Sequence, residues 1–285
     1  MQASRSKNPN SGPAAVLAPT GLRLTIWALG LLATGHGHGQ SLPSIQRDLR
    51  IETIDLVGGH RVRLLSVPLQ QFDLRVLATA PVLKQGSASD ASLLGLSRLL
   101  SMGAGARPVA LLSGGFNRED PLDPVGALIE NKKSYAPLSM ATKSRGSMGR
   151  GYSLSGLLCI GPANQVSIES VDSFQDSRGA CAWALQAGPV VVERDGRDAI
   201  SKKVTGVSHR LIACEPRNGG RSVDFYWFDS ISLLDVEQAL KPRCSSALNL
   251  AGADQAGILL VASGAAAGSV NVPLPSILVI QPRSR

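Results

Sequence analysis

The sequence predicts an α+β fold: a single strand-rich domain with a mixed β-sheet and a few short helices. Three observations support this class. The 285 residues include 30 Gly and 17 Pro, which make turns frequent and long helices rare. Short apolar or alternating runs recur between turn signals. Neither an internal repeat nor a long linker divides the chain, so one domain accounts for it.

Strands are expected wherever apolar or alternating runs lie between turns. Two turns suit hairpins: the gap 68–71, and 216–221, whose Pro, Asn and paired Gly residues are a strong hairpin signal. The expected strands are 61–67, 72–78, 108–112, 125–130, 153–160, 165–171, 190–193, 207–215, 222–228, 247–250, 257–261 and 276–280.

Two helices are expected. Residues 91–102 carry leucines at helical spacing, with Ser89 or Asp90 as the N-cap and Gly103 at the end. The second helix opens at Ser232, which has capping-box spacing to an Asp in place of the usual Glu, and Pro242 closes it.

The N-terminus has the features of a secretory signal. Residues 1–21 are polar and contain basic residues but no acid, and the apolar run 24–34 is shorter than the roughly 20 residues of a membrane span. Small residues suit a cut after Gly35. The alternative is an ordinary buried helix. We therefore expect a signal peptide over 1–35, a lead-in segment over 36–60 and the folded domain over 61–285. The protein would be exported, periplasmic or extracellular, with no stable membrane span after signal removal.

The charge pattern bears on the partner. The chain carries a formal net charge of +8, but its basic residues are scattered and no nucleic-acid motif occurs. We therefore expect no nucleic-acid partner. A mildly positive field favours an anionic small ligand.

Four cysteines follow the signal: Cys159, Cys181, Cys214 and Cys244. An even number in an exported chain allows two disulfides in three connectivities. Cys159 and Cys214 lie in apolar runs, where a buried free thiol is the alternative. Cys244 is expected to be disulfide-bonded or packed behind 247–250, and not catalytic. No cysteine pair has the spacing of a zinc or redox motif, so no metal site is predicted, and the cofactor stays unknown.

Glycine turns at strand ends are the main functional signal. The sequence contains no nucleophile elbow, zinc-protease motif, P-loop or dinucleotide fingerprint. Instead, glycine turns occur over 113–116, 184–190 and 247–254. Glycine there permits a close ligand approach, with backbone N–H groups free to bind an anion. The alternative for any one of them is a plain tight turn.

Taken in order, these segments resemble the phosphodiester glycosidase family. The resemblance covers roughly 108–282, the core of the 61–285 domain. The matching segments are Ser113-Gly114-Gly115-Phe116-Asn117, residues 126–132, 184–192, 210–214, the helix 233–240 with Cys244, residues 247–255 and residues 272–279.

The resemblance implies roles for individual residues. Arg210 would hold a phosphate through its guanidinium. Glu130 and Asp254 are the candidate catalytic carboxylates, since glycosidic cleavage needs an acid and a second group. The implied substrate-binding residues are Ser113, Gly114, Gly115, Gln186, Asn249 and Gly252. Arg210 could instead serve a structural ion pair, and Gln186 and Asn249 could cap their own turns.

The chain departs from the family at three places: the first Asn of the family's Asn-Gly-Gly is Ser113, the Gly after its Arg strand is Cys214, and its Asp-Gly-Gly is altered. The family's Asp-Gly-Gly is Ala251-Gly252-Ala253 here, and Asp254 would emerge at a different point of the turn. Two functions therefore compete. The first is an exported glycosidase that hydrolyses a sugar-1-phosphodiester or a related envelope glycan. The second is a catalytically impaired protein on the same fold that binds a sugar-phosphate, a glycan or an envelope partner.

Overall fold

The computed structural model describes residues 49–83, 87–103, 106–140, 144–145, 151–177, 179–200 and 206–283. By its internal contacts the chain divides into Met1–Gln46 and Arg47–Arg285, and all described residues belong to the second unit. The predicted signal peptide 1–35, and the lead-in as far as residue 48, lie outside the described residues.

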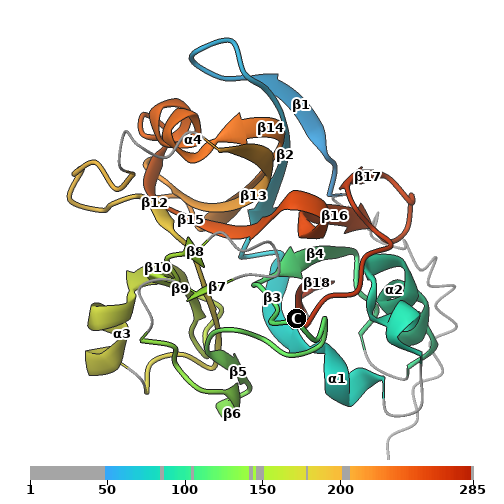
Figure 1. Cartoon of the computed structure of the whole chain (residues 1–285). Helices are drawn as coiled ribbons and strands as arrows, with labels where there is room; N and C mark the ends of the chain where they lie inside the picture. Colours follow the sequence, from blue (N-terminus) through green and yellow to red (C-terminus); the bar gives the residue numbers. More distant parts are fainter. Residues whose placement is uncertain are drawn as a thin grey trace, which may run out of the picture. The chain divides into compact units, whose positions relative to one another are not determined.

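The described strands form three larger sheets and one two-stranded ribbon (Figure 1). The first sheet runs in the order β1 (Glu52–Asp55), β2 (Arg61–Pro68), β14 (Ser222–Ser232), β13 (Val207–Pro216), β15 (Cys244–Gly252), β12 (Val190–Val192). The second runs β10 (Val166–Ser170), β9 (Gly156–Ile160), β11 (Trp183–Ala187), β5 (Leu128–Glu130), β6 (Lys133–Ala136). The third runs β17 (Ala266–Gly268), β16 (Gly257–Leu260), β4 (Ala110–Gly114), β18 (Ser276–Pro282), β3 (Phe72–Ala78). The ribbon pairs β7 (Ser144–Arg145) with β8 (Gly151–Tyr152).

The helices are few and short, as the α+β prediction expected. They are α1 (Thr79–Val82), α2 (Leu93–Met102), α3 (Val171–Ser177) and α4 (Leu233–Leu240), with 3₁₀ turns η1 (Ala88–Ala91) and η2 (Ala253–Gln255). None of these described helices is long and apolar enough to cross a membrane. The strand-rich class is confirmed. Where a mixed sheet was expected, every described strand pair is antiparallel, since neighbouring strands alternate in direction without the helical crossovers that parallel pairs need.

Each large sheet has one face toward a shared core and one face toward a helix. The shared core takes residues from all three sheets, such as Leu65, Leu158 and Leu278. On the outer face of the first sheet, Val236 of α4 packs in a separate cluster. The third sheet is covered in the same way by α2, and the second by α3. Figure 1 shows α4, α2 and α3 on these outer sides.

The turn 68–71 is not a hairpin, so that prediction is wrong. β2 pairs with β14 and β3 pairs with β18, so the chain crosses from the first sheet to the third. The buried amide of Asn164 holds this crossing: its Nδ2 donates to the carbonyls of Leu69 and Phe72, at 3.0 and 2.7 Å, and its Oδ1 accepts from the backbone N–H of Leu74. Local alternation could not reveal the contacts of Asn164, because they join residues that lie 90 or more positions apart in the sequence.

The predicted helix starts shift by a few residues. α2 begins at Leu93, and its cap is Ser92, whose Oγ accepts from the N–H of Gly95 at 3.1 Å. Residues 88–91 form the separate turn η1, capped by Ser87. The second predicted helix is confirmed: Ser232 accepts from the N–H of Asp235 at 3.2 Å. The expected lead-in 36–60 contains strand β1, which pairs with β2.

Two disulfides brace the strands. Cys159 bonds to Cys181 within the second sheet's cluster, and Cys214 of β13 bonds to Cys244 of β15. The alternative of buried free thiols at Cys159 and Cys214 is therefore wrong. The expectation that Cys244 is disulfide-bonded is confirmed, and the residue is fully buried.

Removing a disulfide should lower stability measurably. The bonds close loops of 22 and 30 residues, for which chain entropy predicts about 3 kcal/mol each. We expect the double variant Cys214→Ala/Cys244→Ala to lose about 3 kcal/mol of unfolding free energy in urea titration. Cys159→Ala/Cys181→Ala is the matched comparison, with a similar loss. A change below about 1 kcal/mol in both would contradict the entropic account.

Candidate functional site

Arg210 lies in β13, opposite Gly252 at the end of β15. The two residues are paired across the strands, and the Arg210 side chain is only 3% exposed. A Cβ atom at position 252 would lie 3.1 Å from Arg210 Nη1. Glycine therefore lets the guanidinium lie directly against the strand, and the structure brings these two predicted site residues into contact.

The next pair in register, Leu211 and Ala251, faces the other side of the sheet. Directly opposed residues share a face, and successive residues alternate. Leu211 and Ala251 are both fully buried in the shared apolar core. The position at which the resembling family carries its Asp therefore points into hydrocarbon, away from the Arg210 guanidinium.

The turn after Gly252 is the 3₁₀ turn η2. Ala253 has a positive φ of 54°, a backbone conformation that favours glycine, and its N–H donates to Ser208 Oγ at 3.0 Å. Asp254 is exposed on this turn. Gln255 donates through Nε2 to the Oδ1 of Asn117. The carboxylate of Asp254 therefore lies at the surface beside the Gly252 strand end.

The glycine turn after β4 lies beside this segment. Ser113 Oγ donates to the carbonyl of Gly257 at 3.3 Å, and Ser276 Oγ donates to the carbonyl of Gly114 at 2.5 Å. Gly115 has a φ of 74°, and a Cβ there would lie 3.0 Å from Leu185. The β4 end and the residues that follow it therefore lie beside the segment after the predicted turn 249–254, through the Ser113–Gly257 and Asn117–Gln255 contacts.

Gln186 is buried and its amide is fully engaged. Its Oε1 accepts from the N–H groups of Ala127 and Ser139, both at 2.8 Å. Its Nε2 donates to the carbonyls of Ser139 and Leu154, at 2.7 and 2.9 Å. With 2% exposure, the side chain ties three segments of backbone together. The structure thus places Gln186 as a support for the turns.

Asn249 is fully buried and is paired on one side only. Its Nδ2 donates to the carbonyl of Gly188 at 2.8 Å, while its Oδ1 has no hydrogen-bond partner among the described residues. Asn249 opposes Ile212 on β13, two residues from Arg210, so Asn249 and Arg210 share a face of the sheet. The Oδ1 of Asn249 is therefore an acceptor without a described donor, on the same face of the sheet as Arg210.

Glu130 ends β5 and is partly buried. Its Oε2 accepts from the backbone N–H of Ala78 at 3.2 Å, at the start of α1. The carboxylate therefore supports the junction between β3 and α1. The structure brings Arg210 together with Gly252 and Asn249, and Ser113 with the segment after them, while Glu130 contacts a different strand end.

A ring cluster that includes His209, the sequence neighbour of Arg210, was not predicted, and its Trp227 lies on the Leu211 face of the sheet. His209 stacks on Trp227 with ring centroids 5.8 Å apart, and its Nδ1 lies 3.1 Å from Asp229 Oδ1. Trp227 Nε1 donates to the carbonyl of Ala256 at 3.3 Å. The adjacency of His209 to Arg210 was the available signal, but the pairing of β13 with β14 was needed to bring in Trp227.

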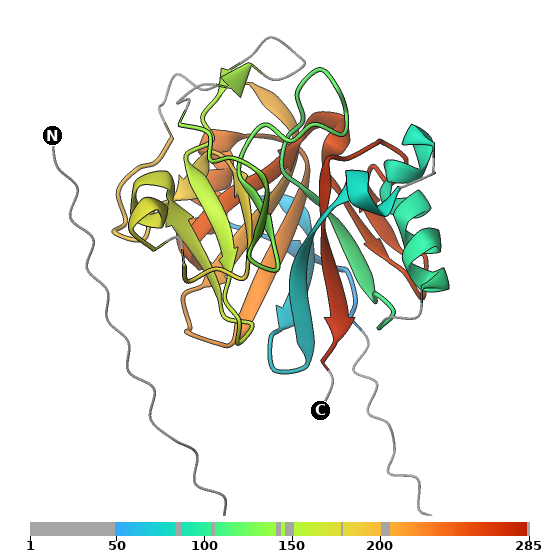
Figure 2. The ribbon, with the colours of Figure 1, turned by 90° about the horizontal axis from the view of Figure 1, so that it is seen from below.

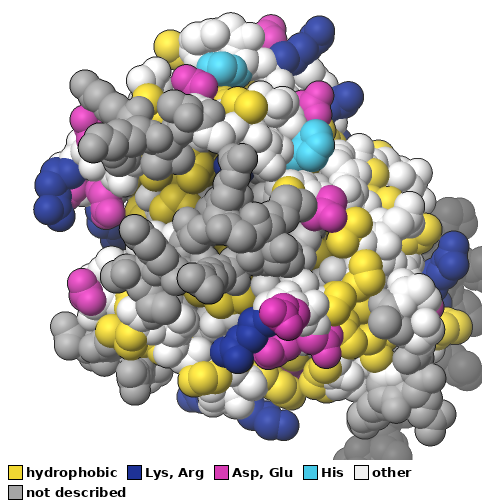
Figure 3. Space-filling model, in the orientation of Figure 1, with side chains coloured by type: hydrophobic (Ala, Val, Ile, Leu, Met, Phe, Trp, Pro, Cys, Tyr) yellow, Lys and Arg dark blue, Asp and Glu magenta, His cyan; other side chains and the backbone are white. Residues whose placement is uncertain are grey.

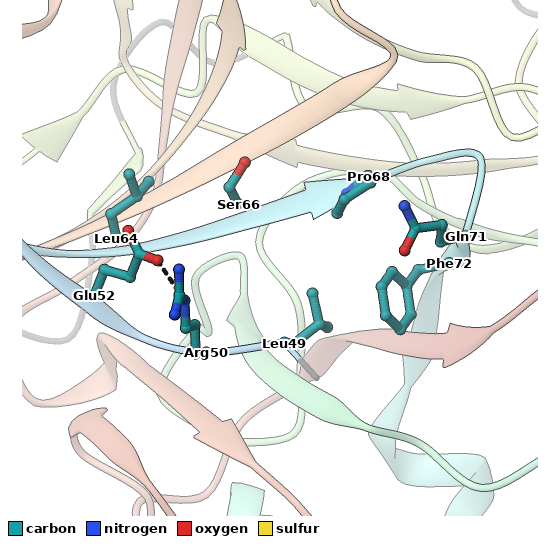
Figure 4. A pocket seen from close by; sticks show the side chains of 8 residues that line it. All are labelled: Leu49, Arg50, Glu52, Leu64, Ser66, Pro68, Gln71 and Phe72. Carbon is teal, nitrogen blue, oxygen red and sulfur yellow. Dashed lines mark ion pairs between the residues drawn. The ribbon is translucent and has the colours of Figure 1, made fainter. Parts of the chain in front are cut away.

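A cavity of about 280 Å³ lies between β2 and residues 49–52 (Figure 4). Three of the polar groups that line it, Arg50, Glu52 and Ser66, are already paired. Arg50 and Glu52 form an ion pair at 2.5 Å, and Ser66 donates to Asp224 at 2.6 Å. Burial raises the pKa of Asp224 and raises the pKa of Tyr226 to about 12. This cavity therefore offers a ligand few hydrogen-bonding groups that are not already bonded within the protein.

A second, larger cavity of about 590 Å³ lies elsewhere, between turns. Neither of these cavities is lined by the predicted site residues. Among the described residues, no group of three or more His, Cys, Asp or Glu side chains is arranged to hold a metal ion.

Comparison with solved structures places the fold in a known class. The catalytic domain of zebrafish N-acetylglucosamine-1-phosphodiester alpha-N-acetylglucosaminidase, auto-inhibited by its pro-peptide, is similar with a TM-score of 0.54 and 14% identity over 82% of each chain. A hypothetical protein from Synechocystis has a TM-score of 0.52 and 14% identity over 82% of this chain and 62% of its own. A putative exported protein from Burkholderia pseudomallei has a TM-score of 0.49 and 10% identity, over 79% and 75%.

No protein-family model and no curated protein sequence matches the chain. At 14% identity the structural likeness shows a distant fold relationship. The chain therefore has a strand-rich fold that is similar to that of the zebrafish catalytic domain.

Proposed function

We propose that the protein binds a sugar-phosphate at the strand end around Arg210 and Gly252, and does not hydrolyse it. One observation carries the proposal. The guanidinium of Arg210 lies buried against Gly252, whereas Ala251, where the resembling family carries an Asp, faces the apolar core on the other side of the sheet. The described residues therefore place a buried cation beside Gly252, with no carboxylate at the position where the resembling family carries its Asp.

The remaining side chains suit binding better than turnover. A guanidinium binds phosphate through two parallel hydrogen bonds, which are stronger where water is excluded. The unpartnered Oδ1 of Asn249 is an acceptor for a sugar hydroxyl. Glycoside cleavage generally uses two carboxyl groups across the scissile bond. Glu130 is bonded at the Ala78 junction and Asp254 is exposed, so neither is held beside the guanidinium by a described contact.

The ligand class rests on the fold comparison. The zebrafish protein with this fold is named for a sugar-1-phosphodiester substrate, and we carry that ligand class over as part of the proposal.

Hydrolysis is the second candidate, and Asp254 is the observation that favours it. This carboxylate lies on η2, two residues from Gly252, and is exposed to solvent. If Asp254 acted on a bound phosphodiester, the protein would release free sugar, which a binding protein would not.

Arg210→Met should weaken binding of a sugar-1-phosphodiester by about 10- to 150-fold, equal to about 1.5–3 kcal/mol, because a charge-assisted hydrogen bond is lost. Arg210→Lys should recover only part of the affinity, since an ammonium lacks the planar fork. Isothermal titration calorimetry on the full chain gives the affinities. Arg61→Met, at an exposed position on β2, is the matched control. Equal affinity in wild type and Arg210→Met would refute the site.

We also propose that the protein is exported. The two disulfides support this, because such bonds persist in oxidising compartments. N-terminal sequencing of the protein from its native host should give a start between about residues 34 and 42. A mature chain that keeps Met1 in a cytoplasmic fraction would contradict export.

A further inference from the structure

The cavity of about 590 Å³ is built from turns of three different sheets. It is lined by the β9–β10 turn (163–166), the β13–β14 hairpin (215–217 and 219–222) and the β2–β3 crossing (69–70), together with Ser245 and Arg283. Figure 2 shows these turns at one end of the sheets, near the C-terminus. The volume lies within the range of small-molecule sites.

The walls of this cavity are cross-braced. Asn164 fixes the β9–β10 turn to the β2–β3 crossing through three hydrogen bonds. The N–H of Arg217 donates to the carbonyl of Arg243 at 2.9 Å, and Ser245 Oγ donates to the carbonyl of Glu215 at 3.1 Å. The Cys214–Cys244 disulfide lies directly next to both contacts in sequence. The turns are therefore held in place before any ligand binds.

The charges in the lining are unbalanced. Three arginines line the cavity, Arg217, Arg221 and Arg283, against one carboxylate, Glu215. Glu215 is already bound by Arg194, whose Nη2 donates to both of its oxygens at 2.8 and 2.7 Å. On the face shown in Figure 3, by contrast, Lys and Arg side chains are interspersed with Asp and Glu.

Two of the three arginines are anchored and the third is available. Arg217 Nε donates to the carbonyl of Lys241 at 2.9 Å, which leaves its outer nitrogens free of that bond. Arg283 donates to the carbonyl of Leu69 and lies 3.7 Å from Asp73. Arg221 has no ion pair or side-chain hydrogen bond to any described residue. Arg221 therefore has no counter-ion among the described residues, and an anion in the cavity would supply one.

We propose that this cavity is a second binding site, for a small compound that carries two neighbouring phosphate groups. Each guanidinium group can bind two phosphate oxygens at once. Three such groups carry more positive charge than a singly charged ligand would balance. Gln70, Gln165 and Ser222 add neutral hydrogen-bonding groups to the lining. This site is separate from the Arg210 site and does not depend on it.

Titration of the full chain with inorganic pyrophosphate tests the proposal. We expect saturable binding of one pyrophosphate that weakens as salt is raised. Arg221→Gln should weaken it about tenfold or more, with an unchanged unfolding midpoint, because the Arg221 side chain makes no hydrogen bond or ion pair to a described residue. Arg61→Gln, an exposed arginine outside the cavity, should leave the affinity unchanged. Arg210→Met should also leave it unchanged, which separates this site from the proposed function.

Sedimentation with vesicles distinguishes the source of the phosphate. If a soluble compound is the ligand, phosphatidylglycerol vesicles should not compete with pyrophosphate. Competition that Arg221→Gln abolishes would assign the same site to a lipid headgroup. Absence of saturable pyrophosphate binding, or equal weakening by Arg221→Gln and Arg61→Gln, would overturn the proposal.

Discussion

Ala251→Asp should destabilise the protein by about 3–5 kcal/mol at pH 7, because it places an uncompensated carboxylate in an apolar core. Ala251 is fully buried beside Leu211, and the nearest predicted cation, Arg210, is on the opposite face of the sheet. Restoring the residue of the resembling family should therefore unfold the chain rather than revive a site.

The pH dependence of this variant has a definite sign. Burial disfavours the charged form, so the pKa of the new carboxyl would lie above that of the unfolded chain. Its penalty should therefore be largest above that raised pKa and shrink as pH falls toward the unfolded value near 3.9. Urea titrations at pH 8 and pH 4.5 measure the loss of unfolding free energy at the high and the low pH. Ala262→Asp, at an exposed turn residue, is the control and should change little. A stable Ala251→Asp protein that releases sugar would show that the site lies one substitution from catalysis.

Gln186→Ala should cost about 3–4 kcal/mol of unfolding free energy, because four hydrogen bonds to buried or partly buried backbone groups are lost at about 1 kcal/mol each. The partners are the N–H and C=O of Ser139, the N–H of Ala127 and the C=O of Leu154. The loss should appear in urea titration without any ligand present.

Two further variants define the role of Gln186. Gln186→Glu keeps the acceptor but removes both donors, so we expect a loss close to that of Gln186→Ala. Gln70→Ala, at an exposed glutamine, should stay within about 0.5 kcal/mol of wild type. If Gln186→Ala were as stable as wild type but failed to bind a sugar-1-phosphodiester, Gln186 would be a ligand-binding residue and not a support.

Local patterns predicted most strands because turn signals and apolar alternation act over a few residues. The Pro, Asn and Gly residues of 216–221 correctly indicated the β13–β14 hairpin. The same logic failed at 68–71, where Asn164, distant in sequence, directs the chain into another sheet. Strand alternation alone therefore predicts elements better than it predicts their partners.

The contacts at the site also depend on residues that are distant in the sequence. The contact of Arg210 with Gly252 depends on the register of β13 with β15, which no spacing in the sequence revealed. The sequence also did not show which face of the sheet each β15 side chain is on, because a bulge between Ala251 and Asn249 shifts the alternation. The sequence left open whether Gln186 binds ligand or caps its turn, because its partners lie 32 to 59 residues away.

Free sugar released from the methyl phosphodiester of α-N-acetylglucosamine-1-phosphate tests the central claim most directly. The full chain would be incubated with this compound at a concentration shown by calorimetry to saturate it, and free N-acetylglucosamine would be quantified by mass spectrometry. A binding protein predicts saturation with release no faster than in the Arg210→Met variant. Repeated turnover by wild type that Arg210→Met abolishes would contradict the account and make the protein a phosphodiester glycosidase.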